Sequence, residues 1–172
     1  MKLTSLVAVA ASFSMALVSS ANAGAQIGDA KFVRDMAIAN MAEIQLGRLA
    51  AERGSSDFVR AFGKQMVDDH QMALNELSVI AENGNPAWPK DVDAKHRALY
   101  QRLSVLSGPM FDSVYKDAMI KGHKAVFAML SAQSRYGSVE RLRDYAMLYA
   151  PIVQEHLRMV AEGNMGGMKM GR

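Results

Sequence analysis

Four segments of this sequence repeat apolar residues at alternating spacings of three and four, the period of one face of an α-helix. They span about residues 29–53, 56–83, 109–136 and 139–163. Short glycine–serine breaks at 54–56 and 137–138 separate the first two segments and the last two. Such breaks end one helix and cap the next, so the sequence predicts two pairs of antiparallel helices.

A longer connection, from Gly84 to Gly108, separates the two pairs. Proline and glycine interrupt it at both ends, and the stretch 93–106 between them has the apolar pattern of a short helix. The connection is long enough to cross the domain, so the second and third long helices are expected to run parallel. The predicted fold is all-α: a ferritin-like four-helix bundle with a short helix in its long connection.

The N-terminal residues have the pattern of a secretory signal peptide. Lys2 supplies the positive charge, the apolar run Leu6 to Val18 follows, and Ala21-Asn22-Ala23 is a small-residue cleavage motif. We expect cleavage near Ala23 and a periplasmic or otherwise exported protein. The predicted organisation is a signal peptide at 1–23, a bundle domain at 24–163 and a flexible tail at 164–172.

The tail is rich in glycine and methionine, with Met165, Met168 and Met170. Thioethers at this spacing can bind cuprous ion. A disordered tail with incidental methionines is the preferred interpretation.

Composition narrows the classes of partner. The chain has 20 Lys and Arg against 17 Asp and Glu, without a basic cluster, which argues against nucleic acid as a partner. The sequence contains no Cys, which excludes disulfides and thiol chemistry. No segment after residue 24 is apolar and long enough to span a membrane. The sequence does not identify a protein partner or an oligomeric state.

Each of the four apolar stripes contains one ionisable residue at a position where a core residue is expected. These residues are Glu43, His70, His123 and His156, one in each long helix. Burying them unpaired costs several kcal/mol in total, so they must hydrogen-bond to one another or to a ligand.

Imidazoles together with a carboxylate suit zinc, iron or copper, so a transition-metal site is the leading hypothesis. Further polar residues are expected to hold the imidazoles in place: Asp69, Asp112, Tyr115 and Glu155. Counting residues from the helix ends puts His70 and His123 level, Glu43 close to them and His156 as the outlier, within roughly 14 Å along the axis. A hydrogen-bond network formed by protein groups alone is the competing interpretation.

Catalytic motifs are absent from the sequence. It has no nucleophile elbow, no glycine-rich phosphate loop and no Cys nucleophile. Binding is therefore favoured over catalysis. The alternative is a structural or stress-protective envelope protein whose polar layer only fixes helix packing, and an enzyme using the layer for redox chemistry ranks last.

The chain resembles an exported bacterial family known as domain of unknown function 4142. The resemblance rests on several segments in the same order: 41–50, Met66-Val67-Asp68-Asp69-His70, 106–108, 111–115, His123 and 151–157. It covers about residues 32–161 and implies an export-competent, ferritin-like helical bundle without an assigned activity.

The sequence departs from the family pattern in two places. Gly122 stands where the family often has an acid, and Ala150-Pro151 replaces a common Leu-Pro. In addition, Val67 and Val153 stand three residues before His70 and His156, where iron-oxidising ferritin-like proteins carry glutamate. A di-iron oxidase is therefore disfavoured.

Overall fold

The computed structural model describes residues 14–81 and 88–165, with side chains from residue 28 onward. It contains five helices: α1 (Ser14–Arg53), α2 (Asp57–Ala81), α3 (Ala94–Ser104), α4 (Gly108–Tyr136) and α5 (Glu140–Glu162). No strand occurs among the described residues. The prediction of an all-α protein with four long helices and one short helix is confirmed.

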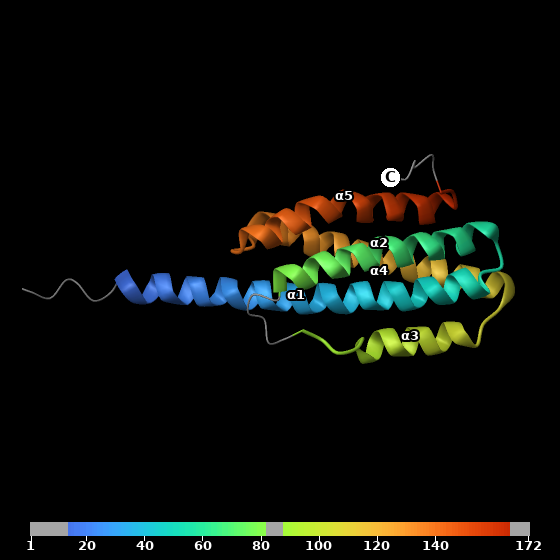
Figure 1. Cartoon of the computed structure of the whole chain (residues 1–172), viewed down its shortest axis with the longest axis horizontal. Helices are drawn as coiled ribbons and strands as arrows, with labels where there is room; N and C mark the ends of the chain where they lie inside the picture. Colours follow the sequence, from blue (N-terminus) through green and yellow to red (C-terminus); the bar gives the residue numbers. More distant parts are fainter. Residues whose placement is uncertain (1–13, 82–87, 166–172) are drawn as a thin grey trace, which may run out of the picture.

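The long helices pack as two antiparallel pairs, α1 with α2 and α4 with α5 (Figure 1). Helices α2 and α4 run in the same direction (Figure 1). Helix α3, which lies between them in sequence, runs back along the outside of the molecule. Helix α3 lies against α1 and α4, so it covers one side of the packed long helices. This path agrees with a connection that crosses the length of the domain.

Helix α1 begins earlier than the sequence pattern predicted. The apolar pattern predicted a helix from about residue 29, but α1 starts at Ser14 and continues through Gly24 and Gly28. The alanines around Gly24 are strong helix formers and offset the helix-weakening effect of the glycines. Cleavage near Ala23 stays a prediction. In the tail, Met168 and Met170 lie outside the described residues.

The apolar core is divided into two halves. One half contains Phe32, Leu77 and Leu130. The other contains Leu49, Phe62 and Phe111. On each long helix the ionisable residue that interrupts the apolar stripe lies in sequence between the positions that contribute to the two halves. The ionisable residues therefore form a polar layer across the middle of the core.

Each tight turn is held by a carboxylate from the opposite helix pair. Asp112 of α4 accepts hydrogen bonds from the backbone N–H groups of Ser55 and Ser56, at 2.7 and 2.8 Å. Asp29 of α1 accepts in the same way from Ser138 and Val139, at 3.1 and 3.0 Å. The carboxylates satisfy backbone donors that the starts of α2 and α5 leave unpaired.

Each of the two tight turns is also bound by an arginine of the helix that follows it. Arg60 donates to the carbonyls of Gly54 and Ser55, and Arg143 donates to those of Gly137 and Ser138. Together with the aspartates, these residues form a repeated turn structure at opposite ends of the fold.

Replacing Asp112 with alanine is expected to lower the free energy of unfolding by about 2 kcal/mol, because two backbone donors lose a charged acceptor. Urea denaturation of the variant measures this loss. Ser113→Ala, at the exposed neighbouring position, serves as the control and should change stability by less than about 0.5 kcal/mol. Equal stability of the two variants would contradict the capping role.

Candidate metal centre

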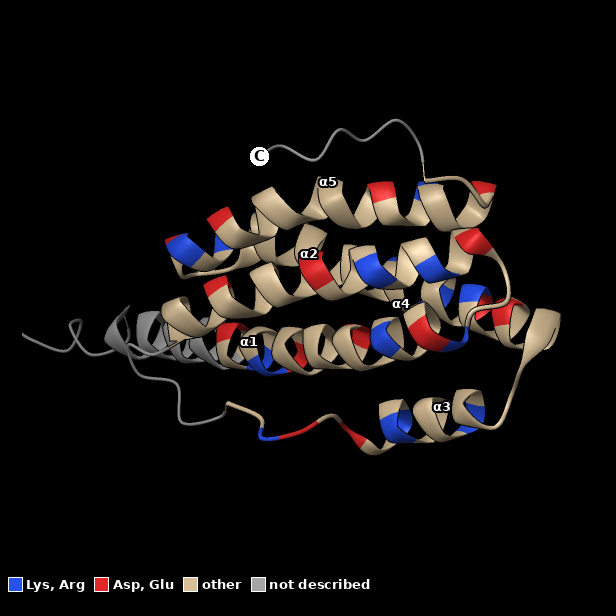
Figure 2. Cartoon of the chain, turned by 45° about the vertical axis from the view of Figure 1, so that its right-hand side comes forward, with Lys and Arg blue, Asp and Glu red and all other residues tan. Residues whose placement is uncertain are grey.

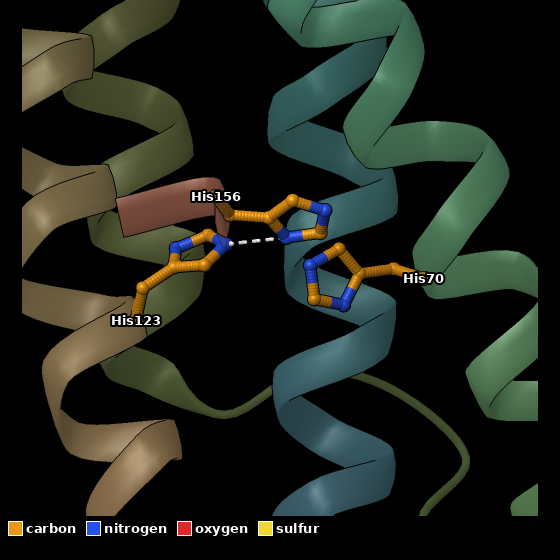
Figure 3. A group of neighbouring side chains, drawn as sticks. All are labelled: His70, His123 and His156. Carbon is orange, nitrogen blue, oxygen red and sulfur yellow. Dashed lines mark hydrogen bonds between the residues drawn. The ribbon is translucent and has the colours of Figure 1, made fainter. Parts of the chain in front are cut away.

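Three imidazoles meet in the polar layer, from α2, α4 and α5 (Figure 3). One ring nitrogen from each of His70, His123 and His156 lies within 4.8 Å of the others. The ring centroids are 5.3 to 5.6 Å apart. All three side chains are buried, with 5% of His70 and 1% of each of the others exposed.

The far side of each ring is held by a hydrogen-bond acceptor. Nδ1 of His70 donates to the Oδ1 atom of Asn40 at 2.8 Å. Nδ1 of His123 donates to the backbone carbonyl of Met119 at 2.9 Å. Nε2 of His156 donates to Oδ2 of Asp69 at 2.8 Å. Because these partners accept hydrogen bonds, each fixes the proton on the nitrogen that faces it.

The remaining nitrogens therefore present lone pairs to the centre. Nε2 of His123 and Nδ1 of His156 face each other at 3.3 Å, the contact drawn as a dashed line in Figure 3. Nε2 of His70 has no hydrogen-bond partner within the described part of the chain. Three inward lone pairs without a donor between them are the arrangement that a cation satisfies.

The electrostatic environment keeps the imidazoles of His70 and His123 neutral. Burial, followed by the proximity of His123 and His156, holds the pKa of His70 well below its usual value. Burial and the nearby His156 lower the pKa of His123 to about 3. Neutral imidazole is the form that binds a metal, so His70 and His123 are ready to coordinate at neutral pH.

Asp69 provides a negative charge beside the imidazoles. Burial raises the pKa of its carboxyl, but hydrogen bonds from His156 and Gln65 outweigh this effect and leave the pKa below its usual value. Gln65 donates to the same oxygen as His156, at 2.6 Å. An ionised carboxylate behind an imidazole orients the ring and increases its basicity.

Glu43 lies on the other side of His123. Its Oε1 is 3.8 Å from Nδ1 of His123, the nitrogen that faces away from the other two imidazoles. Its Oε2 is buried and has no partner among the residues that the structure places. Burial raises the pKa of this carboxyl to about 8. Glu43 thus adjoins the imidazole cluster without facing its centre.

The other residues expected around the imidazoles have different surroundings. Asp112 binds the turn before α2, and Glu155 pairs with Arg158. Tyr115 packs against Phe62 and Phe111, and burial raises its pKa well above the usual value. Only Asp69 of the four predicted supporting residues hydrogen-bonds to an imidazole in the described structure.

The expectation that His156 is the outlier was wrong. It rested on counting from helix ends that the sequence defines poorly. Counting from the tight turn at Ser138 gives the observed arrangement, because His123 lies 15 residues before it and His156 18 residues after it. A tight turn sets the alignment of two antiparallel helices, so residues at similar distances from it come close together, here within a turn of helix.

The same rule identifies Asn40, which the sequence analysis missed. Asn40 and His70 lie at equal distances from Ser55, 15 residues before and after it. Asn40 also donates to the hydroxyl of Tyr145 at 3.2 Å, which orients its carbonyl oxygen toward His70. The search for ionisable residues in the apolar stripes did not select Asn40, because its side-chain amide is not ionisable.

Comparisons with known proteins agree with the all-α architecture. The family described as "Domain of unknown function (DUF4142)" matches residues 14–162. The structure is similar to the crystal structure of a DUF305 fragment from Deinococcus radiodurans, with a TM-score of 0.69 and 15% identity. The match covers 78% of this chain and 93% of the fragment. No curated protein matches the chain. No described helix is apolar over a stretch long enough to cross a membrane.

Proposed function

Because the chain belongs to the domain of unknown function 4142 family, whose description assigns no activity, we propose from its own residues that it binds a transition metal ion. The ligands are His70, His123 and His156. The observation that carries the proposal is the set of three inward lone pairs, each fixed by an acceptor on the opposite side of its ring.

The spacing of the imidazoles suits a small ion. Metal–nitrogen bonds of about 2.0–2.1 Å at tetrahedral angles separate two nitrogens by about 3.3 Å. The nitrogens of His123 and His156 have this separation of 3.3 Å. His70 completes the site by a small movement toward them, because its inward nitrogen has no described partner to lose.

The chemistry of the ligands selects the metal. Three imidazole ligands favour zinc, copper or iron over magnesium and calcium, which prefer oxygen ligands. The ionised Asp69 partly balances the charge of the ion through His156. Three protein ligands leave a fourth position open for water or another small molecule.

The competing function is a structural layer without metal. The hydrogen bonds of Asn40 to Tyr145 and of Asp69 to Gln65 favour it, because they tie the layer together with protein groups alone. Such a layer would fix the packing of an envelope protein. It leaves the lone pairs of His123 and His156 facing each other, which the metal site explains and the structural layer does not.

Two further assignments belong to this proposal. The parallel course of α2 and α4, with α3 crossing outside, supports a ferritin-like bundle (Figure 1). Lys2, the apolar run after it and the small residues around Ala23 support export to the periplasm or beyond.

Titration of chelator-treated protein with Zn²⁺, Cu²⁺ and Fe²⁺ tests metal binding, with bound metal measured by elemental analysis after gel filtration. We expect one equivalent in the wild-type protein and none in His70→Ala. His96→Ala is the matched control, because His96 lies on α3 and pairs with Asp93 and not with the three clustered imidazoles. Wild-type protein without stoichiometric metal, or His70→Ala with undiminished metal, would refute the site.

Asp69→Asn is expected to weaken metal binding by about 10- to 100-fold, the usual effect of removing a carboxylate that supports a histidine ligand. Competition with a chromogenic chelator measures the affinity. Asp68→Asn, at the exposed adjacent position, should leave the affinity unchanged. If both variants bind like the wild type, Asp69 does not support the ligand His156.

A further inference from the structure

A cavity of about 310 Å³ lies beneath α3, where this helix covers α1 and α4. Part of its wall is apolar and consists of Leu46, Leu99, Val114, Ala118 and Met119. The volume accommodates a small organic molecule, and the apolar wall suits a hydrocarbon chain or ring.

Basic side chains also line the cavity. Lys95 and Arg102 of α3 and Lys121 of α4 are exposed residues of its lining, against one exposed acid, Asp117. Helix α3 contains three basic residues and no acidic residue, and Figure 2 shows this as blue segments on an otherwise tan helix. This charge attracts anions to the cavity and disfavours the approach of metal cations.

A buried residue with an unpartnered polar atom lines the same cavity. Glu43 lines it and is 6% exposed, and its Oε2 has no hydrogen-bond partner in the described structure. Gly122 lies beside it, and a Cβ atom added there would be 3.3 Å from Oε1 of Glu43. The glycine therefore keeps space open next to a carboxyl group that can accept a hydrogen bond.

We propose that this cavity binds a small organic acid with an apolar body. The carboxylate of the ligand pairs with Lys95, Arg102 and Lys121, and its body lies along the apolar wall. A hydroxyl group at the far end of the ligand donates to Oε2 of Glu43. The site differs from the imidazole cluster in position and in the sign of the charge that it attracts, so it does not depend on the proposed function.

Isothermal titration with hexanoate, 6-hydroxyhexanoate and 1-hexanol tests the proposal. We expect one molecule of each carboxylate to bind and the alcohol to bind at least 10-fold more weakly. We also expect 6-hydroxyhexanoate to bind more tightly than hexanoate, with this preference lost in Glu43→Leu. Repeating the titrations on chelator-treated protein and on His70→Ala separates the result from metal binding.

Two variants block the cavity in different ways. Arg102→Glu reverses a charge, and Gly122→Leu fills space beside Glu43, so each should weaken hexanoate binding at least 10-fold. Gln101→Ala, an exposed position of α3 that does not line the cavity, is the control. Thermal denaturation checks that each variant folds. Absence of saturable binding of the carboxylates, or equal affinity in wild type and both variants, would overturn the proposal.

Discussion

Valine in place of Gly63 is expected to lower the free energy of unfolding by about 3 kcal/mol or more. Gly63 of α2 and Gly47 of α1 lie where these helices approach each other closely. A Cβ atom on Gly63 would be 2.6 Å from the carbonyl oxygen of Gly47, 2.7 Å from the amide nitrogen of Ala51 and 2.9 Å from the Cβ of Ala50. Backbone atoms of α1 cannot move aside without separating the two helices.

Equilibrium denaturation in urea measures the effect, with circular dichroism to establish whether the variant folds at all. Gly28→Ala is the matched control, because no atom lies within 4 Å of a Cβ added at this helical position. This control should stabilise the protein by up to about 1 kcal/mol, since alanine favours helix more than glycine does. A Gly63→Val variant as stable as the wild type would show that the helices can separate at little cost.

Replacing Glu43 with glutamine should remove a loss of stability that the wild-type protein suffers as the pH rises. Burial raises the pKa of Glu43 from 4.5 to about 8. Below pH 4.5 the carboxyl is protonated in both the folded and the unfolded chain, so Glu43 does not reduce the free energy of unfolding. Between pH 4.5 and about pH 8 the carboxyl of Glu43 is ionised in the unfolded chain but protonated in the folded protein. The free energy of unfolding therefore falls by about 1.4 kcal/mol for each pH unit.

Glutamine cannot ionise, so the advantage of Glu43→Gln over the wild type should grow by about 4 kcal/mol between pH 4 and pH 8. Urea denaturation at both pH values, with chelator present, measures this difference. Glu52→Gln, at an exposed position of α1, should show no such change. A constant difference between Glu43→Gln and the wild type would mean that Glu43 is ionised in the folded protein.

The helices and their tight turns could be predicted because both depend on nearby residues. The apolar spacing that includes Phe62, Met66 and His70 requires one buried helical face, and Gly54 and Gly137 mark the two tight turns. Gly47 lies opposite Gly63, where the absence of side chains permits the close approach of α1 and α2. The predicted start of α1 near residue 29 was wrong, because glycines do not end a helix when strong helix formers surround them.

The site was predictable only in part because it depends on alignment between helices. The sequence identified the three histidines as buried polar residues, since each interrupts an apolar stripe. It did not reveal Asn40, which is not ionisable. It also did not reveal the roles of Asp29 and Asp112 at the turns, because the contacts of these aspartates join different helix pairs. The cavity beneath α3 was also missed, since the position of α3 depends on a long connection with no regular pattern.

The division of the core into two apolar halves affects how the molecule opens. Each half adjoins its own carboxylate-held turn, with Asp112 near Phe111 and Asp29 near Phe32. Amide protons at the two ends can therefore exchange with solvent through separate local fluctuations, as in proteins built from distinct cooperative units. An ion held between α2, α4 and α5 would link the two halves across that boundary, so that they would open together as one cooperative unit.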